Sequence, residues 1–268
     1  MKQSVKLILL IVLCSAQFAR VQSSTKIIDV NNITEYPYLA FVEVLEAYSS
    51  GNGAIISDTH VITDASFKSP DPGVQIDVYV GSAEQRGVIL FKSLSFQKHP
   101  QYNPTNLDNN VAIITINGTF AGLPNVQPIA IRTSAFAQDP TSCFSIGWGV
   151  YVPSSNVSPA RRINYQLVTD QACAASVLGP QPSTIQCASA KKGSGSYDIS
   201  GSPFVCDNQL YGVLAALGDF FNDAQPIDRF VKLTEISIQE FLVPFVPQKS
   251  SVPQNNSVPQ RRNYVSCA

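Results

Sequence analysis

The chain has 268 residues, of which 44% are apolar and 14% are charged, and its formal net charge is −1. These proportions suit one globular unit of two packed halves with a sizeable core. A nearly neutral chain offers no electrostatic case for binding nucleic acid.

The first 23 residues have the pattern of a secretory signal peptide. Lys2 and Lys6 precede an apolar run over residues 7–13, and the small residues Cys14 to Ala16 follow it. A membrane anchor would need about 20 apolar residues, and this run is too short. We therefore expect a secreted, extracellular protein with no membrane partner.

The cysteines and glycosylation patterns fit an oxidising, extracellular compartment. Cys14 leaves with the signal peptide, so five cysteines remain and cannot all pair. The Asn-X-Ser/Thr acceptor pattern is present at Asn32, Asn117, Asn156 and Asn255. We expect disulfide bonds, one leftover cysteine and a glycoprotein.

The chain from Tyr36 onward is divided into short apolar runs. These runs cover residues 39–42, 54–56, 60–63, 74–80 and 88–91, and turn residues such as Pro70 and Gly73 separate them. This pattern predicts an all-β barrel or sandwich.

The C-terminal part predicts a short helix followed by an extended tail. Thr234 can cap the helix, and Ile238, Phe241 and Leu242 share one face. Val-Pro-Gln then repeats every six residues in a tail over 243–268. Cys267 in this tail either joins another chain or stays a capped or unpaired thiol.

Four ordered motifs carry a resemblance to a known family. They are Gly-Ser-Gly-Ser-Tyr-Asp-Ile-Ser-Gly-Ser-Pro at 193–203, the segments 51–57 with 61–67, the segment 106–114, and Cys-Phe-Ser-Ile-Gly-Trp-Gly at 143–149. Together they resemble the chymotrypsin-like, or trypsin-family, serine proteases. The resemblance implies two six-stranded antiparallel β-barrels and a short C-terminal helix over residues 27–242.

The resemblance also implies that the catalytic positions are altered. Ser200 takes the nucleophile position, but Ser66 stands at the catalytic histidine and Asn110 at the aspartate. Serine and asparagine are neither bases nor acids near neutral pH. Asp198 and Ile199 replace the oxyanion-hole glycine and the aspartate that receives a new amino terminus.

Two further family features follow from the same comparison. Cys143 should pair with Cys206, and Cys173 with Cys187. Residues 24–26 precede a junction resembling the family's activation site at Lys26–Ile27, but Ile199 offers a buried ammonium no counter-charge, which costs about 3 to 5 kcal/mol. Activation by that route is not expected, and cleavage of the bond itself is left open.

Three functions are consistent with these features. The preferred one is a catalytically inactive homologue that binds an extracellular protein, such as a protease, its substrate or an inhibitor. The second is a serine hydrolase with a rearranged base, for which Asp64, Asp198, His60 or His99 are candidates. The third is a structural protein linked through its tail and Cys267. None of these requires a cofactor or a metal.

Overall fold

A computed structural model describes residues 28–67, 75–87, 89–138, 140, 142–149, 159–176, 180–190, 200–218 and 227–247. Several expectations fall outside these ranges: the signal peptide, the segment 24–26, the Lys26–Ile27 bond, Asn156, Asp198, most of the tail with Asn255, and Cys267.

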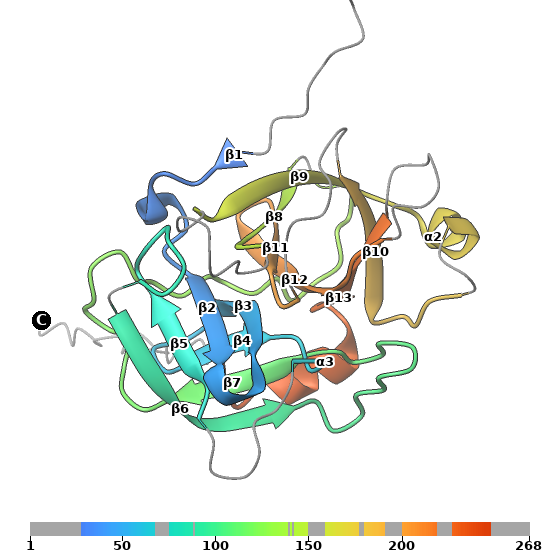
Figure 1. Ribbon diagram of the computed structural model, residues 1–268. Coiled ribbons are helices and arrows are strands. Elements are labelled where there is room, and N and C mark those ends of the chain that lie inside the picture. The colour runs from blue at the N-terminus through green and yellow to red at the C-terminus, as the bar shows by residue number, and fades with distance from the viewer. Residues whose placement is uncertain are drawn as a thin grey trace, which may run out of the picture.

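The first half of the chain forms a closed antiparallel barrel (Figure 1). Its strands are β2 (Leu39–Val44), β3 (Ser49–Ile55), β4 (His60–Thr63), β5 (Asp77–Val80), β6 (Ile89–Lys98) and β7 (Ala112–Ile116), in the order β2-β3-β4-β7-β6-β5. Two short 3-10 turns, η1 (Ile33–Glu35) and η2 (Leu45–Ala47), flank β2. All six residues of β2 are buried, as expected for a strand packed on both faces.

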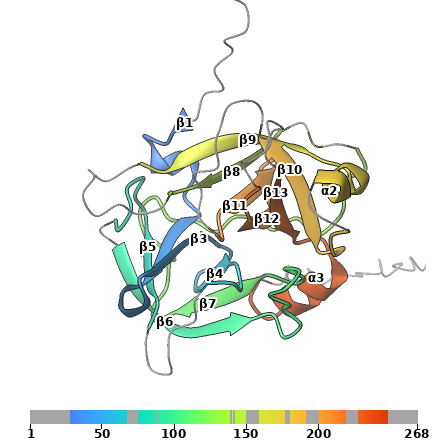
Figure 2. The same ribbon diagram turned by 45° about the vertical axis from the view of Figure 1, so that its right-hand side comes forward.

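The second half forms another closed barrel, which lies beside the first (Figures 1 and 2). Its strands are β8 (Cys143–Gly147), β9 (Arg161–Leu167), β10 (Ile185–Ala190), β11 (Pro203–Cys206), β12 (Gln209–Ala216) and β13 (Ile227–Lys232). Pairing of β9 with β8 closes the barrel, and β1 (Ile28–Asp29) adds to the outer edge of β9. The prediction of two six-stranded antiparallel barrels is confirmed.

Two short helices complete the described part of the chain. They are α2 (Asp170–Ser176) and α3 (Ile236–Leu242), and neither is long and apolar enough to cross a membrane. In both views α3 lies beside β7 of the first barrel (Figures 1 and 2). The predicted C-terminal helix is therefore present, and it connects the end of the second barrel to the first.

The predicted Thr234 cap of α3 is wrong. The N-cap is Glu235, and its side chain makes no capping hydrogen bond. Leu233 is buried and donates its N–H to the Tyr211 carbonyl, so the chain is still held against the barrel immediately before Thr234. The helix consequently starts later than its sequence pattern indicates, with Ile238 and Leu242 on its buried face.

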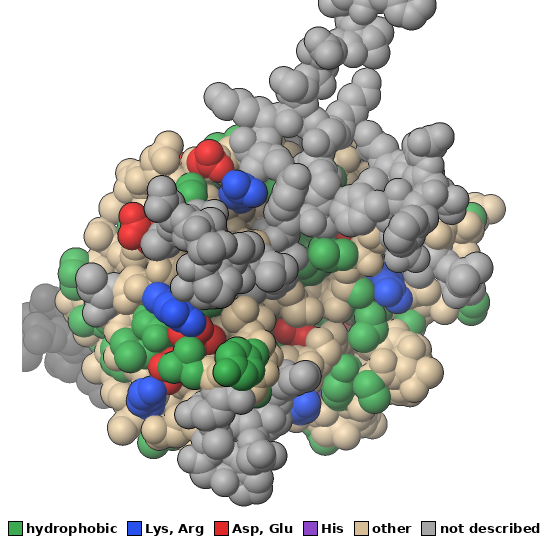
Figure 3. All heavy atoms as spheres, viewed as in Figure 1, with side chains coloured by type: hydrophobic (Ala, Val, Ile, Leu, Met, Phe, Trp, Pro, Cys, Tyr) green, Lys and Arg blue, Asp and Glu red, His purple; other side chains and the backbone are tan. Residues whose placement is uncertain are grey.

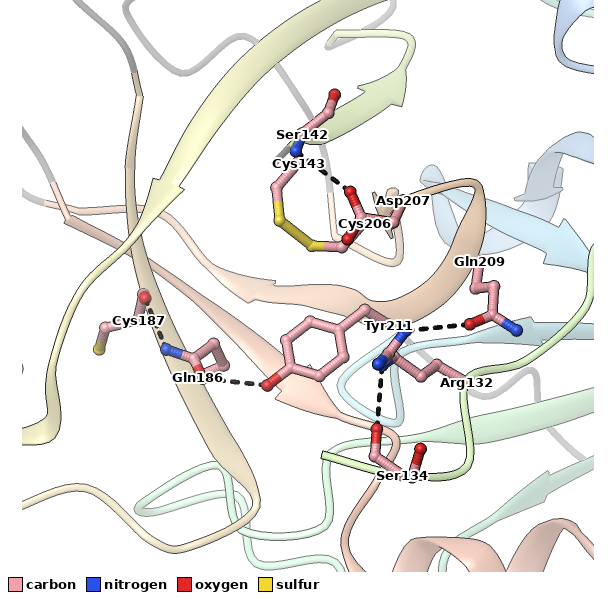
Figure 4. Close-up of a disulfide and its surroundings, with 10 residues drawn as sticks. All are labelled: Arg132, Ser134, Ser142, Cys143, Gln186, Cys187, Cys206, Asp207, Gln209 and Tyr211. Carbon is pink, nitrogen blue, oxygen red and sulfur yellow. Dashed lines mark hydrogen bonds between the residues drawn. A yellow bond between two sulfur atoms is a disulfide. The ribbon is translucent and has the colours of Figure 1, made fainter. Parts of the chain in front are cut away.

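Both disulfide bonds implied by the resemblance are present. Cys143–Cys206 joins β8 to β11, and Cys173–Cys187 joins α2 to β10. Figure 4 shows the first bond with the Ser142 N–H donating to Asp207 beside it. A native disulfide of a small secreted domain stabilises it by about 2 to 5 kcal/mol.

The buried amide of Asn52 joins the two barrels. The Nδ2 of Asn52 on β3 donates to the Trp148 carbonyl at 3.0 Å and to Ser202 Oγ at 2.8 Å, and its Oδ1 accepts from the Trp148 N–H at 3.3 Å. A Cβ on the neighbouring Gly147 would lie 2.4 Å from this Nδ2. The space between the barrels is therefore fitted to the Asn52 side chain.

Replacing this amide should destabilise the fold. In Asn52→Ala the buried N–H and carbonyl of Trp148 lose their partner, so we expect the free energy of unfolding to fall by about 1 to 3 kcal/mol or more. Urea unfolding followed by Trp148 fluorescence measures the change. The matched control is Asn31→Ala, because Asn31 is exposed; equal losses in both variants would contradict the assignment.

Candidate functional site around Ser200

Ser200 is half-buried and lies between the two barrels, just before β11. Its carbonyl accepts a hydrogen bond from the Asn52 N–H at 3.0 Å. The next residue, Gly201, has φ +82°, and a Cβ there would lie 2.2 Å from the Asn52 carbonyl oxygen and from Thr63 Oγ1. A glycine is required at this position because the backbone has a positive φ and because there is no room for a Cβ. The backbone that carries Ser200 is therefore fixed between the barrels.

The carboxylate of Asp64 binds Ser66 and lies near Ser200. Asp64 follows β4 and is fully buried. Its Oδ2 accepts from the Ser66 N–H at 3.1 Å and from the Ser66 hydroxyl in a very short contact. The Ser200 hydroxyl is close enough to lower the pKa of Asp64, but it does not complete a hydrogen bond to Oδ1, which has no partner among the described residues.

Burial dominates the titration of Asp64. It raises the pKa of this carboxyl from 3.8 to about 6, against the opposing effect of the hydrogen bonds from Ser66 and of the Ser200 hydroxyl. Burial also raises the pKa of the half-buried Tyr102, and the Asp64 charge raises it further. Asp64 is thus mainly ionised at neutral pH, with Tyr102 within electrostatic reach.

Asn110 shares the Ser66 N–H with Asp64. It is fully buried just before β7, and its Oδ1 accepts from the Ser66 N–H at 2.9 Å. Its Nδ2 has no hydrogen-bond partner among the described residues. The three positions that the resemblance singled out, Ser66, Asn110 and Ser200, are therefore brought together, with Asp64 among them.

Neither histidine of the chain hydrogen-bonds to this cluster. The Nδ1 of His60 contacts the hydroxyls of Ser57 at 2.7 Å and Thr59 at 3.1 Å, and burial lowers the pKa of His60. The Nδ1 of His99 accepts from the Gln101 N–H, so its Nε2–H donates to the Ser237 carbonyl at 3.1 Å. The sequence contains two histidines, and both have these other partners.

The described residues provide two exposed glycosylation candidates and no metal cluster. Asn32 and Asn117 are exposed, and the Asn32 Oδ1 accepts from the Thr34 hydroxyl at 2.7 Å. Glycosylation at either position stays a prediction. Across the described ranges, no group of three His, Cys, Asp or Glu side chains could hold a metal ion.

The face of the molecule in Figure 3 carries charges of both signs. Lys and Arg side chains are interspersed with Asp and Glu and with hydrophobic side chains, rather than gathered by sign. A partner binding to this face would meet mixed polar and apolar chemistry.

The two barrels, with Ser200 between them, define a chymotrypsin-like serine protease fold. The solved structure of neuropsin, a serine protease expressed in the limbic system of mouse brain, superposes with a TM-score of 0.65 at 19% identity, over 77% of this chain and 93% of that one. The family model for trypsin matches residues 28–237, so the chain belongs to the trypsin family.

Individual trypsins are similar to the chain over most of their length. Trypsin delta of Drosophila melanogaster is 29% identical over 189 residues, which cover 68% of this chain and 74% of the relative. A trypsin of Xenopus laevis is 31% identical over 183 residues, covering 65% and 72%.

The buried Asp64 carboxyl should make stability depend on pH. Because its folded pKa of about 6 exceeds the ordinary 3.8, the folded state holds the proton more tightly. The free energy of unfolding should therefore fall by about 2 kcal/mol as pH rises from about 4 to about 6, out of about 3 kcal/mol over the whole titration, and change little from this group above about pH 7.

Urea unfolding of the wild type and Asp64→Asn across this pH range tests this contribution. The Asp64→Asn profile should lack it, whereas Asp58→Asn, which alters an exposed carboxylate, should retain it. Parallel profiles for the wild type and Asp64→Asn would refute the titration.

Proposed function

We propose that this chain is a secreted, catalytically inactive member of the trypsin family that acts by binding another extracellular protein. The observation that carries the proposal is the set of groups around Ser200. Ser66 stands at the position of the catalytic histidine, and its hydroxyl donates to Asp64 rather than accepting a proton from Ser200. Both histidines are engaged elsewhere.

The contact between Gly51 and Phe67 supports the alignment behind this proposal. The resemblance places these residues where the family has a disulfide next to the catalytic histidine. A Cβ on Gly51 would lie 3.3 Å from Phe67 Cδ2, so the aromatic ring fills the space beside that position. Two substitutions that contact each other in this way support the assignment of Ser66.

The loss of the base accounts for the loss of turnover. A serine hydroxyl attacks a carbonyl only if a neighbouring group takes its proton. Removing a triad member of a serine protease lowers turnover by as much as about 10⁶-fold, and Asn110 cannot replace the carboxylate charge that stabilises an imidazolium. The barrels and their surface loops still provide a stable surface for a protease, a substrate or an inhibitor.

A fluorophosphonate probe tests the inactive assignment. The secreted protein should show no labelling at Ser200 above that of Ser200→Ala and no peptide cleavage, while an active trypsin in the same assay is labelled fully. Labelling that disappears in Ser200→Ala would refute the proposal.

A second candidate function follows from the buried Asp64 beside Ser200. In a serine hydrolase with this base, Ser200 Oγ would attack the carbonyl carbon of a substrate while its proton passes to the Asp64 carboxylate. Asp64 would then give this proton to the leaving group as the bond between that group and the carbonyl carbon breaks. A carboxyl whose pKa is raised towards neutrality is better matched to this role than an ordinary one.

The same probe separates the two candidates through paired variants. If Asp64 is the base, the wild type should be labelled, Asp64→Asn should lose at least about 10²-fold in labelling rate, and Asp58→Asn should react normally. Equal rates in both variants would exclude Asp64 as the base. A structural role through Cys267 stays a prediction.

A further inference from the structure

A pocket of about 430 Å³ opens where the linker between the barrels crosses the second barrel. Its lining comes from the segment before β2, the linker over residues 128–130, strand β8 with the residue before it, strand β9, and strand β11 with the turn after it. The pocket shares no lining residue with the Ser200 cluster. Its size is in the range of small-molecule sites.

Three aromatic rings form the wall of this pocket. Tyr36 packs edge-on against Tyr38 and Phe144, with ring centroids 6.5 and 5.9 Å apart. Burial raises the pKa of Tyr38, and the Tyr36 phenol raises it further. This wall would bury an apolar or aromatic body while keeping phenol groups nearby.

One cation, Arg162 of β9, lines the pocket. Its guanidinium carbon lies 4.1 Å from the centroid of the Phe144 ring, and its Nη1 donates to the Tyr36 hydroxyl at 3.1 Å. Its buried Nε has no hydrogen-bond partner among the described residues. The described ion pairs do not include Arg162.

The adjacent Arg161 provides a contrast on the same strand. Its Nε lies 3.4 Å from a carboxylate oxygen of Asp29, so its charge is paired. Two neighbouring arginines thus differ in that one has a carboxylate partner and the other faces a pocket. Because the Nε of Arg162 is buried, a ligand in the pocket would have to bind the terminal nitrogens of this residue, of which Nη1 already donates to Tyr36.

The remaining charge on the pocket restricts what can bind. Glu35 also lines it, but this residue is exposed and makes no ion pair with Arg162. Because the pocket has the Arg162 guanidinium and the Glu35 carboxylate, it disfavours a polyanion such as a sulfated sugar. It can accept a ligand that carries a single negative charge. Arginine recognises carboxylates through paired, charge-assisted hydrogen bonds.

We propose that this pocket binds a monocarboxylate carried on an apolar or aromatic body, with Arg162 as its anion-binding residue. The carboxylate supplies the ion-pair partner that Arg162 does not find among the described residues, and the body of the ligand packs on Tyr38 and Phe144. Such a group is supplied either by the C-terminal residue of a peptide or by a free organic acid. The proposal does not depend on whether Ser200 is active.

Calorimetric titration of the full mature chain tests the proposal with two acids and their uncharged counterparts. N-acetylphenylalanine represents a peptide C-terminus and phenylacetate a free organic acid, and the corresponding amides lack the charge. We expect at least one acid to bind more than about tenfold tighter than its amide. The acid that binds more tightly identifies the source.

Variants of the two adjacent arginines provide the control. Arg162→Gln should weaken binding of the acid at least about tenfold and leave binding of the amide unchanged. Arg161→Gln, which removes the same charge from the next residue, should keep wild-type affinity. The unfolding transition of each variant verifies its fold, and Tyr36→Phe should weaken binding less than Arg162→Gln.

The proposal is overturned by any of three results. The first is that neither acid binds at about 10 mM, a concentration that should detect ligands of this size. The second is that the acid and its amide bind equally tightly. The third is that folded Arg161→Gln and Arg162→Gln weaken binding of the acid by the same factor. None of these outcomes bears on the labelling of Ser200, so this site and the proposed function can fail separately.

Discussion

The arrangement around Ser200 depends on the hydrogen bonds of the buried residue Asn52. Its amide bonds to Trp148 and Ser202 of the second barrel, while its own backbone N–H holds the Ser200 carbonyl. Leaving such buried groups unpaired costs about 1 to 3 kcal/mol each, so the barrels cannot separate here without a large loss of stability. The position of Ser200 is a consequence of how the barrels are joined, and it does not require the chemistry of an active site.

Ser66, Asp64 and Asn110 are joined by hydrogen bonds to Ser66 instead of forming a proton relay, while Asp64 Oδ1 and Asn110 Nδ2 have no partner among the described residues. Ser66 donates its hydroxyl to Asp64 and its N–H to both Asp64 and Asn110, so Ser66 stabilises a buried carboxylate. Desolvation still outweighs these hydrogen bonds and raises the Asp64 pKa to about 6. The cluster therefore retains an ionisable carboxyl group, that of Asp64, near Ser200. The two candidate functions differ in whether this carboxylate acts as a base.

The short apolar runs predicted an all-β fold, whereas the two barrels and the two disulfides could be predicted only through the resemblance to the trypsin family, which rests on several ordered motifs. The start of α3 could not, because Thr234 is a good cap locally but the buried Leu233 keeps the chain on the barrel. The contact of Ser66 with Asp64 was also missed, since the direction of a buried side chain depends on neighbours from β7 and from the Ser200 turn. Asn52 left only a weak signal, a polar residue between Gly51 and Gly53 just before the apolar run 54–56.

Arg162 could not be distinguished from Arg161 in the sequence, because the surroundings of each side chain depend on the fold. Adjacent residues of a strand point to opposite faces, so one guanidinium lies near Asp29 while the other lies over Phe144. The aromatic surface compensates a cation only in part, and it leaves the Nε without an acceptor. A binding function located at this pocket would be independent of the Ser200 chemistry, because the two sites share no side chain and are built on different contacts between the barrels.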